Sequence, residues 1–446
     1  MPTPTTASFN VETIETPALG DRSYLVHDGK VALVVDPQRD IDRILDLAER
    51  LGARITHIVE THVHNDYVSG GLALARATGA LHVHADAEGL AFEHQPVIGG
   101  SSFDVGSFQV EVVATPGHTP HHLSYVVRGA GRPPAAFTGG SLLYGTVGRT
   151  DLVDGIDPRE ATRSQYHSVR QLADLLPDGA TIHPTHGFGS FCASTQSESE
   201  SDGSMQTERE VNVALTTDDE DTFVDRILSG LTAHPAYYAH MDPLNRAGAW
   251  PIDLSTPAPV DAAELGRRLH RGEWVVDLRG RRLFAADHVR GTINIELNDS
   301  FLTYLGWLIP WGIGLTLLAP TSEEITEAQR QLALIGIDRP RGAAAGRPNT
   351  WGDDRNNYPV TTFDHLDTYD GTVLDVRRPD ERSTGAIDGS VHLPLDELLD
   401  SLDELPPGRL LVHCASGFRA SIAASLLARA GRDVVLIDDS FDRERQ

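Results

Sequence analysis

The chain opens with a pattern of hydrophobic and polar positions that predicts strands followed by a helix. Residues from about 9 to 36 alternate apolar and polar side chains around two glycines, which indicates hairpin strands. From 41 to 51 the apolar positions recur at helical spacing instead. Asp40 is the expected N-cap of this helix, and Gly52 is its expected end.

Further along, short apolar runs end in polar turns. Residues 54–60 form a β-branched run typical of a buried strand, 72–78 have helical spacing, and 81–84 form another strand pattern. His82 and His84 lie inside that last pattern rather than after it, so we assign them a structural role.

The second half of the chain contains an internal repeat. A strand ending at Asp277 is followed fourteen residues later by Gly291, and a strand ending at Asp375 is followed at the same spacing by Gly389. Each unit alternates short apolar strands with helices. This order predicts a parallel sheet covered on both faces.

Polar and turn-rich stretches separate these parts. Residues 193–210 are rich in Ser, Glu, Gln and Thr, which predicts a mobile surface loop. Residues 218–231 return to helical spacing, whereas 234–245 are turn-rich. We expect the first domain boundary at 251–259 and a linker between the two repeat units at 342–357.

One stretch, 301–319, is nearly uncharged and long enough to suggest a membrane span. Pro310 and three glycines interrupt it, and no basic flank follows. We therefore expect a buried strand and loop here.

Composition narrows the classes of function. A net charge of −27 argues against nucleic acid and anionic membranes as partners, because both need a basic footprint. Lys30 is the only lysine, and the acidic excess suggests a salt-rich cytoplasm. The two cysteines, Cys192 and Cys414, form no disulfide framework, and the first residues lack the features of a signal peptide. We expect a cytoplasmic protein.

The loop after the strand at 54–60 carries candidate metal ligands. His62, His64 and Asp66 stand at alternate positions, and the glycines that follow allow tight backbone curvature. Two imidazoles and a carboxylate suit a borderline ion such as zinc or iron. Two later strands end in turns that deliver His118, within Pro-Gly-His, and His186. These three strand ends predict one metal site.

These motifs resemble the metallo-β-lactamase superfamily, whose metal loop follows His-x-His-x-Asp-His and whose later ligands follow Pro-Gly-His, Thr-Gly-Asp and final-histidine turns. Within it, residues 148–151, Gly-Arg-Thr-Asp, are similar to the glyoxalase II relatives that oxidise persulfides. The resemblance implies one iron held by two histidines and an aspartate. Two family ligands are absent, because Tyr67 stands in place of a histidine and Gly140 in place of that aspartate.

Three histidines offer a different ligand set. His62, His64 and His118 can form a three-histidine site with water in the fourth position, an arrangement known for catalytic zinc. Asp66 and His186 would then be outer partners or ligands to a second ion. The alternative is a cavity that has lost its metal, since ligand count sets affinity.

Three further residues are auxiliary candidates in this cavity: Tyr67, Arg149 and Cys192. Cys192 follows His186 closely enough to share the cavity rim. It is either a buried inert thiol or one that handles persulfide.

A loop between a strand and a helix in the second repeat unit carries the other cysteine. Its residues are Cys414, Ala415, Ser416, Gly417, Phe418 and Arg419. Backbone N–H groups at a helix N-terminus, with an arginine nearby, stabilise a thiolate and cradle an anion. The loop resembles that of rhodanese, in which cysteine carries sulfur as a persulfide; protein tyrosine phosphatases place the arginine one residue later. The first unit has no cysteine and resembles a silent rhodanese repeat.

We therefore predict an α/β chain of three domains: a metallo-β-lactamase-like αββα sandwich at 8–250, a rhodanese-like domain without the catalytic cysteine at 258–342, and a rhodanese domain at 358–446. The resemblance implies a persulfide dioxygenase and sulfurtransferase with Fe(II), acting on a thiol persulfide, thiosulfate or sulfite, with Cys414 and Arg419 as catalytic residues. The alternatives are a zinc-dependent thioester hydrolase related to glyoxalase II, and a metal-free binding domain beside an active rhodanese. We expect a homo-oligomer with no nucleic-acid or membrane partner.

Overall fold

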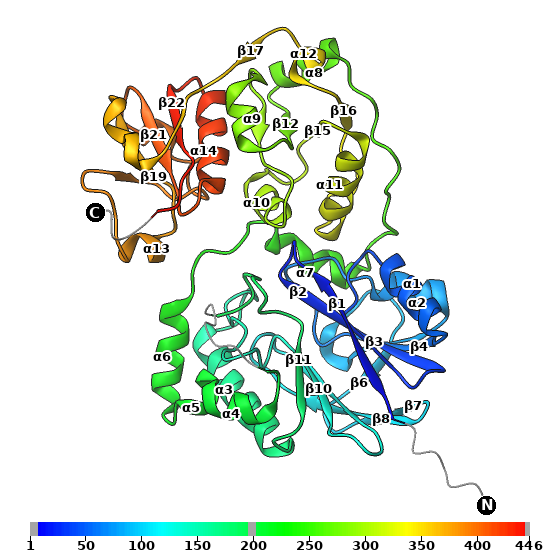
Figure 1. Ribbon diagram of the computed structural model, residues 1–446. Helices are drawn as coiled ribbons and strands as arrows, with labels where there is room; N and C mark the ends of the chain where they lie inside the picture. Colours follow the sequence, from blue (N-terminus) through cyan, green and yellow to red (C-terminus); the bar gives the residue numbers. More distant parts are fainter. Residues whose placement is uncertain (1–7, 195–201, 442–446) are drawn as a thin grey trace, which may run out of the picture. The chain divides into compact units, whose positions relative to one another are not determined.

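The computed structural model describes residues 8–194 and 202–441. The chain folds into two compact units (Figure 1). The first is built from residues up to Ile252 together with Ala333–Gly336, and the second from Asp253–Leu332 and the chain from Ile337 onward.

The first unit contains two β-sheets, one of six strands in the order β1-β2-β3-β4-β5-β6 and one of five in the order β11-β10-β9-β8-β7. The strands of the first are β1 Asn10–Thr16, β2 Asp21–His27, β3 Val31–Val35, β4 Arg54–Val59, β5 Leu81–Ala85 and β6 Gln95–Val97. Those of the second are β7 Ser102–Val105, β8 Phe108–Ala114, β9 Leu123–Arg128, β10 Ala135–Gly139 and β11 Thr181–Pro184.

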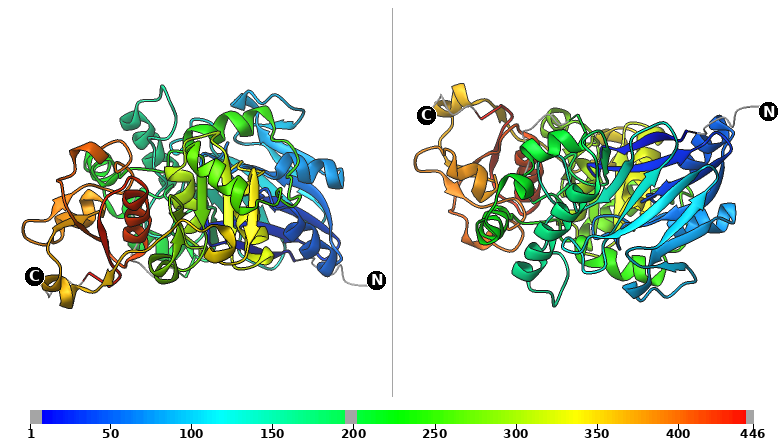
Figure 2. Two further views of the ribbon diagram at one scale, coloured as in Figure 1. Left: turned by 90° about the horizontal axis from the view of Figure 1, so that it is seen from above. Right: turned by 90° about the horizontal axis from the view of Figure 1, so that it is seen from below.

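Strand alternation explains how these sheets stack into four layers. On β2, Tyr24 and Val26 point toward the second sheet and pack against residues such as Val112 and Phe137. Leu25, between them, points to the other face and packs with Ile44 of helix α1. The outer face of the second sheet packs against helix α3 in the same way. The result is an αββα sandwich with the strands side by side in its centre (Figure 2).

The helices of this unit are α1 Asp42–Leu51, α2 Gly71–Thr78, α3 Pro158–Leu175, α4 Met205–Val211, α5 Val213–Thr216, α6 Glu220–Gly230 and α7 Tyr238–Ala247. Gly52 ends α1 in the left-handed conformation, as predicted. The prediction that Asp40 caps α1 is wrong. The N-cap is Ile41, and the Asp40 carboxylate accepts a hydrogen bond from Arg43 at 3.0 Å instead.

Two stretches predicted to be irregular contain helices. Residues 205–210 of the predicted surface loop belong to helix α4, because Met205 packs into the core beside α3 and Ser204 caps the helix. The part of that predicted loop at 195–201 lies outside the described residues. The turn-rich segment at 234–245 forms α7 from Tyr238 onward, with Pro243 inside the helix and Met241 buried. Tertiary burial outweighs the weak helical pattern at both places.

The second unit contains two parallel sheets, in the orders β14-β12-β15-β16 and β18-β22-β21-β19-β20. Their strands are β12 Trp274–Asp277, β14 Ile293–Asn294, β15 Leu315–Ala319, β16 Gly342–Ala345, β18 Val360–Thr361, β19 Thr372–Asp375, β20 Val391–His392, β21 Leu410–His413 and β22 Val434–Ile437. A separate antiparallel pair joins β13 His288–Val289 to β17 Arg355–Asn356. The helices are α8 Ala262–His270, α9 Arg281–Ala286, α10 Phe301–Leu308, α11 Ser322–Leu334, α12 Pro348–Trp351, α13 Pro379–Ser383 and α14 Phe418–Arg429.

The same hydrogen bonds recur around the strand-end aspartates of the two sheets. Arg279 makes a bidentate ion pair with Asp277, and Arg377 makes one with Asp375. The shortest N–O distances are 2.6 and 2.7 Å. The backbone carbonyl of each aspartate accepts a hydrogen bond from the backbone N–H of the residue that follows the neighbouring edge strand. Each arginine side chain also donates to the backbone carbonyl of the residue eight positions after it in the chain. The repeated motif in the sequence therefore corresponds to a repeated local structure.

Two predictions in this unit need correction. The stretch 301–319 contains helix α10 before strand β15, rather than a strand and loop, because Phe301, Leu302 and Leu305 are buried at helical spacing. The expected linker at 342–357 begins with β16, which pairs with β15 as an edge strand. Among the described residues, no helix is both long and apolar enough to cross a membrane.

Candidate functional site

Three strand ends of the first unit bring four histidines together in one buried place. His62 and His64 follow β4, His118 follows β8, and His186 follows β11. Each of these side chains is 1 % exposed or less. The two sheets thus deliver ligand-type side chains to a shared edge from loops that the strands hold rigid.

Two overlapping groups of side chains have the spacing of metal ligands. The candidate ligand atoms of His62, His118 and His186 lie within 4.8 Å of one another, as do those of His64, Asp66 and His186. The predicted set of His62, His64 and His118 is therefore brought to one place, but the compact three-histidine group contains His186 where we expected His64.

Hydrogen bonds fix the ring nitrogens of two of these histidines. The Thr61 hydroxyl donates to Asp36 at 2.7 Å, so its oxygen must accept from Nδ1 of His62, 2.9 Å away. The Nδ1 of His118 donates to the carbonyl oxygen of Arg149 at 2.7 Å. Both rings therefore direct an unprotonated Nε2 into the site, as metal-binding histidines do. The Nε2 of His118 has no hydrogen-bond partner among the described residues.

His186 lies between two buried carboxylates. Its Nδ1 is 2.9 Å from Asp21 and 3.1 Å from Asp66, and its Nε2 is 3.4 Å from Nε2 of His62. Burial opposes its charge, but the two carboxylates raise the pKa of His186 well above the usual value. Burial and the charge of Asp66 raise the pKa of Asp21 to about 8. A cation bound at this place would face the same two carboxylates.

In the second unit, Cys414 lies between β21 and the N-terminus of α14. Its sulfur accepts the backbone N–H of Gly417 at 3.2 Å, and the side chain is 1 % exposed. Gly417 has a φ of 88°, and a Cβ there would lie 2.3 Å from a carboxylate oxygen of Asp438. Glycine is therefore required for the turn that aims this N–H at the sulfur.

Arg419 is held by an acidic neighbour. Its guanidinium makes a bidentate pair with Glu381, with N–O distances of 2.5 and 2.6 Å. Burial opposes the charge, but the Glu381 hydrogen bonds raise the pKa of Arg419 above its usual value. The arginine is thus permanently charged and fixed in direction.

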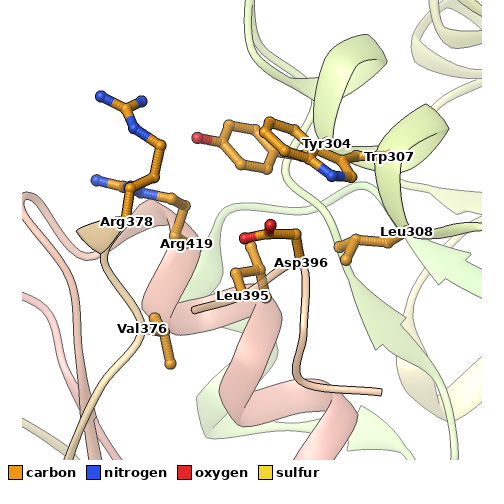
Figure 3. Close-up of a pocket in the computed structure, with 8 residues that line it drawn as sticks. All are labelled: Tyr304, Trp307, Leu308, Val376, Arg378, Leu395, Asp396 and Arg419. Atoms are coloured by element: carbon orange, nitrogen blue, oxygen red, sulfur yellow. The ribbon is translucent and has the colours of Figure 1, made fainter. Parts of the chain in front are cut away.

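A small cavity adjoins this loop (Figure 3). The guanidinium groups of Arg378 and Arg419 lie on one side of it, and the rings of Tyr304 and Trp307 lie on the other. The Tyr304 ring also contacts Phe418 of the cysteine loop, with centroids 5.6 Å apart. Asp396 also lines the cavity, and the two guanidinium groups beside the aromatic rings are the part of the lining that suits a small anion or an anionic thiol.

Comparisons with known proteins match two parts of the chain to known families. Residues 18–186 match the family model described as the metallo-beta-lactamase superfamily, and residues 363–443 match the rhodanese-like domain. The "Persulfide dioxygenase ETHE1, mitochondrial" of Bos taurus is 30% identical over 242 residues, covering 54% of this chain and 80% of that protein. Its Homo sapiens counterpart is 32% identical over 200 residues, covering 44% and 70%.

The chain belongs to the metallo-β-lactamase superfamily. A solved metallo-beta-lactamase from Staphylococcus aureus subsp. aureus COL aligns with a TM-score of 0.69 at 27% identity, covering 76% of this chain and 99% of that one. The predicted fold class is confirmed: a metallo-β-lactamase domain precedes a C-terminal rhodanese-like domain with a parallel sheet.

The metallo-β-lactamase fold implies a metal, and the buried donors fit one. The Nε2 of His118, Nδ1 of His64 and one oxygen of Asp66 have no hydrogen-bond partner among the described residues, whereas Nε2 of His64 lies 3.4 Å from carboxylate oxygens of Asp36 and Glu60. Buried polar atoms without partners cost free energy that a bound cation would recover. His62, His118 and His186 could hold such an ion.

Tyr67 and Gly140 stand where the family pattern has a histidine and an aspartate. Tyr67 stacks on His64 with ring centroids 4.3 Å apart, and its hydroxyl donates to the carbonyl of Asp36 at 3.3 Å. Burial and nearby carboxylates raise the pKa of Tyr67 well above its usual value, so it keeps its proton. Gly140 has no side chain to offer; its backbone N–H donates to Nε2 of His122 at 3.1 Å, and its carbonyl accepts the backbone N–H of Gly148 at 3.0 Å.

His122 is a site residue that the sequence analysis missed. Its ring stacks on that of His62 with centroids 4.9 Å apart. Its Nε2 accepts from Gly140, so Nδ1 carries the proton and donates to Thr115 at 2.8 Å. This histidine supports His62 without a lone pair for a metal. Its place four residues after His118 in the sequence was the available signal.

The other two auxiliary candidates, Arg149 and Cys192, take supporting positions. Arg149 pairs with Asp151 at 2.7 Å while its carbonyl orients His118. Cys192 is buried, and burial together with the charges of Asp66 and Asp21 raises its pKa well above the usual value. Its thiol lies 3.8 Å from the Tyr238 hydroxyl. These surroundings favour the protonated, unreactive form.

Proposed function

We propose that this chain is an enzyme of sulfane-sulfur metabolism that oxidises a low-molecular-weight persulfide to sulfite in its first domain and transfers sulfur through Cys414. The observation that carries the proposal is the presence, in one chain, of a buried three-histidine group and a cysteine loop at a helix N-terminus. The relatives named persulfide dioxygenase support the first half of the proposal.

In the first domain, His62, His118 and His186 would hold the metal, with His64 and Asp66 beside them. A bound iron would supply the redox chemistry that dioxygen requires. The protein's own contribution is to orient two imidazoles through Thr61 and the Arg149 carbonyl, to exclude water by burial, and to balance charge with Asp66.

In the rhodanese-like domain, the proposed step is nucleophilic. The Cys414 thiolate attacks the outer sulfur of thiosulfate, an S–S bond forms at Cys414, the S–S bond of thiosulfate breaks, and sulfite leaves with the electron pair. A thiolate acceptor then attacks the outer sulfur of the Cys414 persulfide and restores the thiolate. Arg419 and Arg378 would hold the sulfonate oxygens, and Gly417 would stabilise the negative sulfur.

We infer that the middle domain is a silent copy of this domain. Asp277 pairs with Leu318 across its sheet as Asp375 pairs with His413 across the other. The residue after His413 is Cys414, and the residue after Leu318 is Ala319, which has no nucleophile. The repeated hydrogen bonds around Asp277 and Asp375 support common architecture.

A second candidate function for the first domain is thioester hydrolysis with zinc. It is favoured by the three-imidazole group without a carboxylate at Gly140, because three histidines and a water form a known catalytic zinc site. A hydroxyacylglutathione hydrolase from Albidiferax ferrireducens is also 31% identical over 179 residues, covering 67% of that protein.

One preparation tests both candidates. Wild-type, His118→Ala and Cys414→Ser proteins are purified anaerobically, and iron and zinc are measured per chain alongside oxygen uptake with glutathione persulfide and cleavage of a glutathione thioester. We expect iron and oxygen uptake in wild type and Cys414→Ser, and neither in His118→Ala. Zinc with thioester cleavage would support the hydrolase instead. Sulfurtransfer with no oxygen uptake and no metal would reject the dioxygenase.

A further inference from the structure

A second group of buried ligand-type side chains lies on the outer face of the first sheet. Glu60 follows β4, and His82 and His84 lie on the neighbouring parallel strand β5. Residues two apart on a strand share a face, so both histidines point toward the side on which Glu60 lies. The three side chains are 1 to 5 % exposed. The sequence pattern alone gave His82 and His84 a structural role.

These side chains meet as metal ligands would. One ligand atom from each lies within 4.8 Å of the others, and Nε2 of His82 is 3.5 Å from Oε1 of Glu60. Both ring nitrogens of His82 and Nδ1 of His84 have no hydrogen-bond partner among the described residues. A purely structural histidine pair in a protein interior would normally satisfy these atoms.

The space between them is kept open. A cavity of about 20 Å³ is lined by the three residues, which is room for one water molecule or one ion. A Cβ on Gly71 would lie 2.2 Å from Oε1 of Glu60 and 2.4 Å from Nε2 of His82. Because this position is glycine, no side chain blocks the space between the two ligand atoms.

Neighbouring groups orient the ligands. The Ser69 hydroxyl donates to Oε1 of Glu60, and its oxygen accepts the backbone N–H of Gly71 at 2.9 Å. The Phe92 ring stacks on His82, with an interplanar angle of 4° and centroids 5.6 Å apart. Such supporting contacts are typical of metal sites.

We propose that Glu60, His82 and His84 form a second binding site for a divalent transition-metal ion. Two histidines and one carboxylate are a ligand set of zinc and of non-haem iron(II). The site shares no ligand with the group of His62, His118 and His186, but its cavity is also lined by His62 and His64. The chain therefore has a group of two histidines and one carboxylate next to the primary centre. The primary centre itself lacks a carboxylate at position 140, which is glycine.

Metal stoichiometry tests this site independently of any catalytic activity. The full-length chain is stripped with chelator, loaded with Zn²⁺, freed of excess metal by gel filtration, and analysed for zinc per chain. We expect two ions in wild type, one in the double variant His82→Ala/His84→Ala, and one in His62→Ala/His118→Ala. Co²⁺ titrations should show two sets of visible absorption bands, one lost in each double variant. His57→Gln, a half-buried histidine on β4 outside both groups, is the matched control and should keep two ions.

Glu60→Gln keeps the volume of the side chain and removes its charge, so it tests the site if the histidine variants fold poorly. We expect it to weaken Zn²⁺ binding at one site at least tenfold, with unchanged far-ultraviolet circular dichroism. The proposal would be overturned if wild type binds one ion and only the His62→Ala/His118→Ala variant loses it. Two ions retained in a folded His82→Ala/His84→Ala variant would overturn it as well. Neither outcome depends on whether the protein oxidises persulfides.

Discussion

The ring of His118 occupies the space that a side chain at position 140 would need. A Cβ on Gly140 would lie 2.2 Å from Cδ2 of His118 and 2.6 Å from its Nε2. Gly148 closes the other side, since a Cβ there would lie 2.8 Å from Nδ1 of the same ring. A carboxylate side chain at position 140 would therefore collide with the ring of His118. His118 cannot keep its position beside a residue larger than glycine.

Gly140→Ala should therefore weaken metal binding and lower stability. The added methyl group forces His118 to move, and overpacking of this kind costs about 1–3 kcal/mol. We expect a lower melting temperature and a weaker Zn²⁺ affinity in a competition titration. Gly266→Ala is the matched control, because nothing lies within 4 Å of its Cβ, and it should be neutral or stabilising. An unchanged metal affinity in Gly140→Ala would contradict the role of this contact.

Cys414→Ser should abolish thiosulfate:cyanide sulfurtransfer and leave the fold intact. The serine hydroxyl has similar size but cannot carry sulfane sulfur. The rate of thiocyanate formation measures this, with Cys192→Ser as the control that should keep the wild-type rate. If instead Cys192→Ser is inactive and Cys414→Ser is active, the sulfur carrier is in the first domain.

Arg378→Ala and Arg419→Ala should separate substrate binding from stability. Both guanidinium groups line the cavity beside the cysteine loop, so each loss should raise the KM for thiosulfate by roughly tenfold or more, as for a charged hydrogen bond worth about 1.5–3 kcal/mol. Arg419→Ala should also lower the melting temperature, because it leaves Glu381 without its bidentate partner. A thiosulfate KM equal to that of wild type in both variants would show that the anion binds elsewhere.

The Glu381 carboxylate should give the second unit an acid-sensitive contribution to stability. Burial opposes its charge, but Arg419 lowers the pKa of Glu381 below the usual value. The contribution is complete above the unfolded-state pKa of about 4.3 and is lost as pH falls through the lower folded-state pKa. Melting curves of wild type and Glu381→Gln should differ most near neutral pH and converge in acid. A difference independent of pH would mean that the pair contributes through packing alone.

Added salt should stabilise the chain. With a net charge of −27, repulsion between acidic side chains opposes folding, and salt screens it. We expect the melting temperature to rise from low to molar potassium chloride. A fall over that range would indicate that ion pairs, rather than repulsion, dominate the surface electrostatics.

Much of this protein is determined by local sequence patterns. Strand β4, the end of α1 at Gly52 and helix α6 follow from hydrophobic period and terminating residues, because these signals act over a few neighbours. The repeat around Asp277 and Asp375 and the loop at Cys414 are likewise visible in the sequence, since each depends on residues close together in the chain.

Long-range packing decided the rest. Helices α4 and α7 form in polar or turn-rich stretches because Met205 and Met241 find buried positions in the core. The grouping of His186 with His62 and His118, the support from His122, and the meeting of Glu60 with His82 and His84 all join separate loops or neighbouring strands. The sequence shows which side chains can bind a metal, but distances between side chains on different strands are set by the stacking and register of the sheets, which no local pattern encodes.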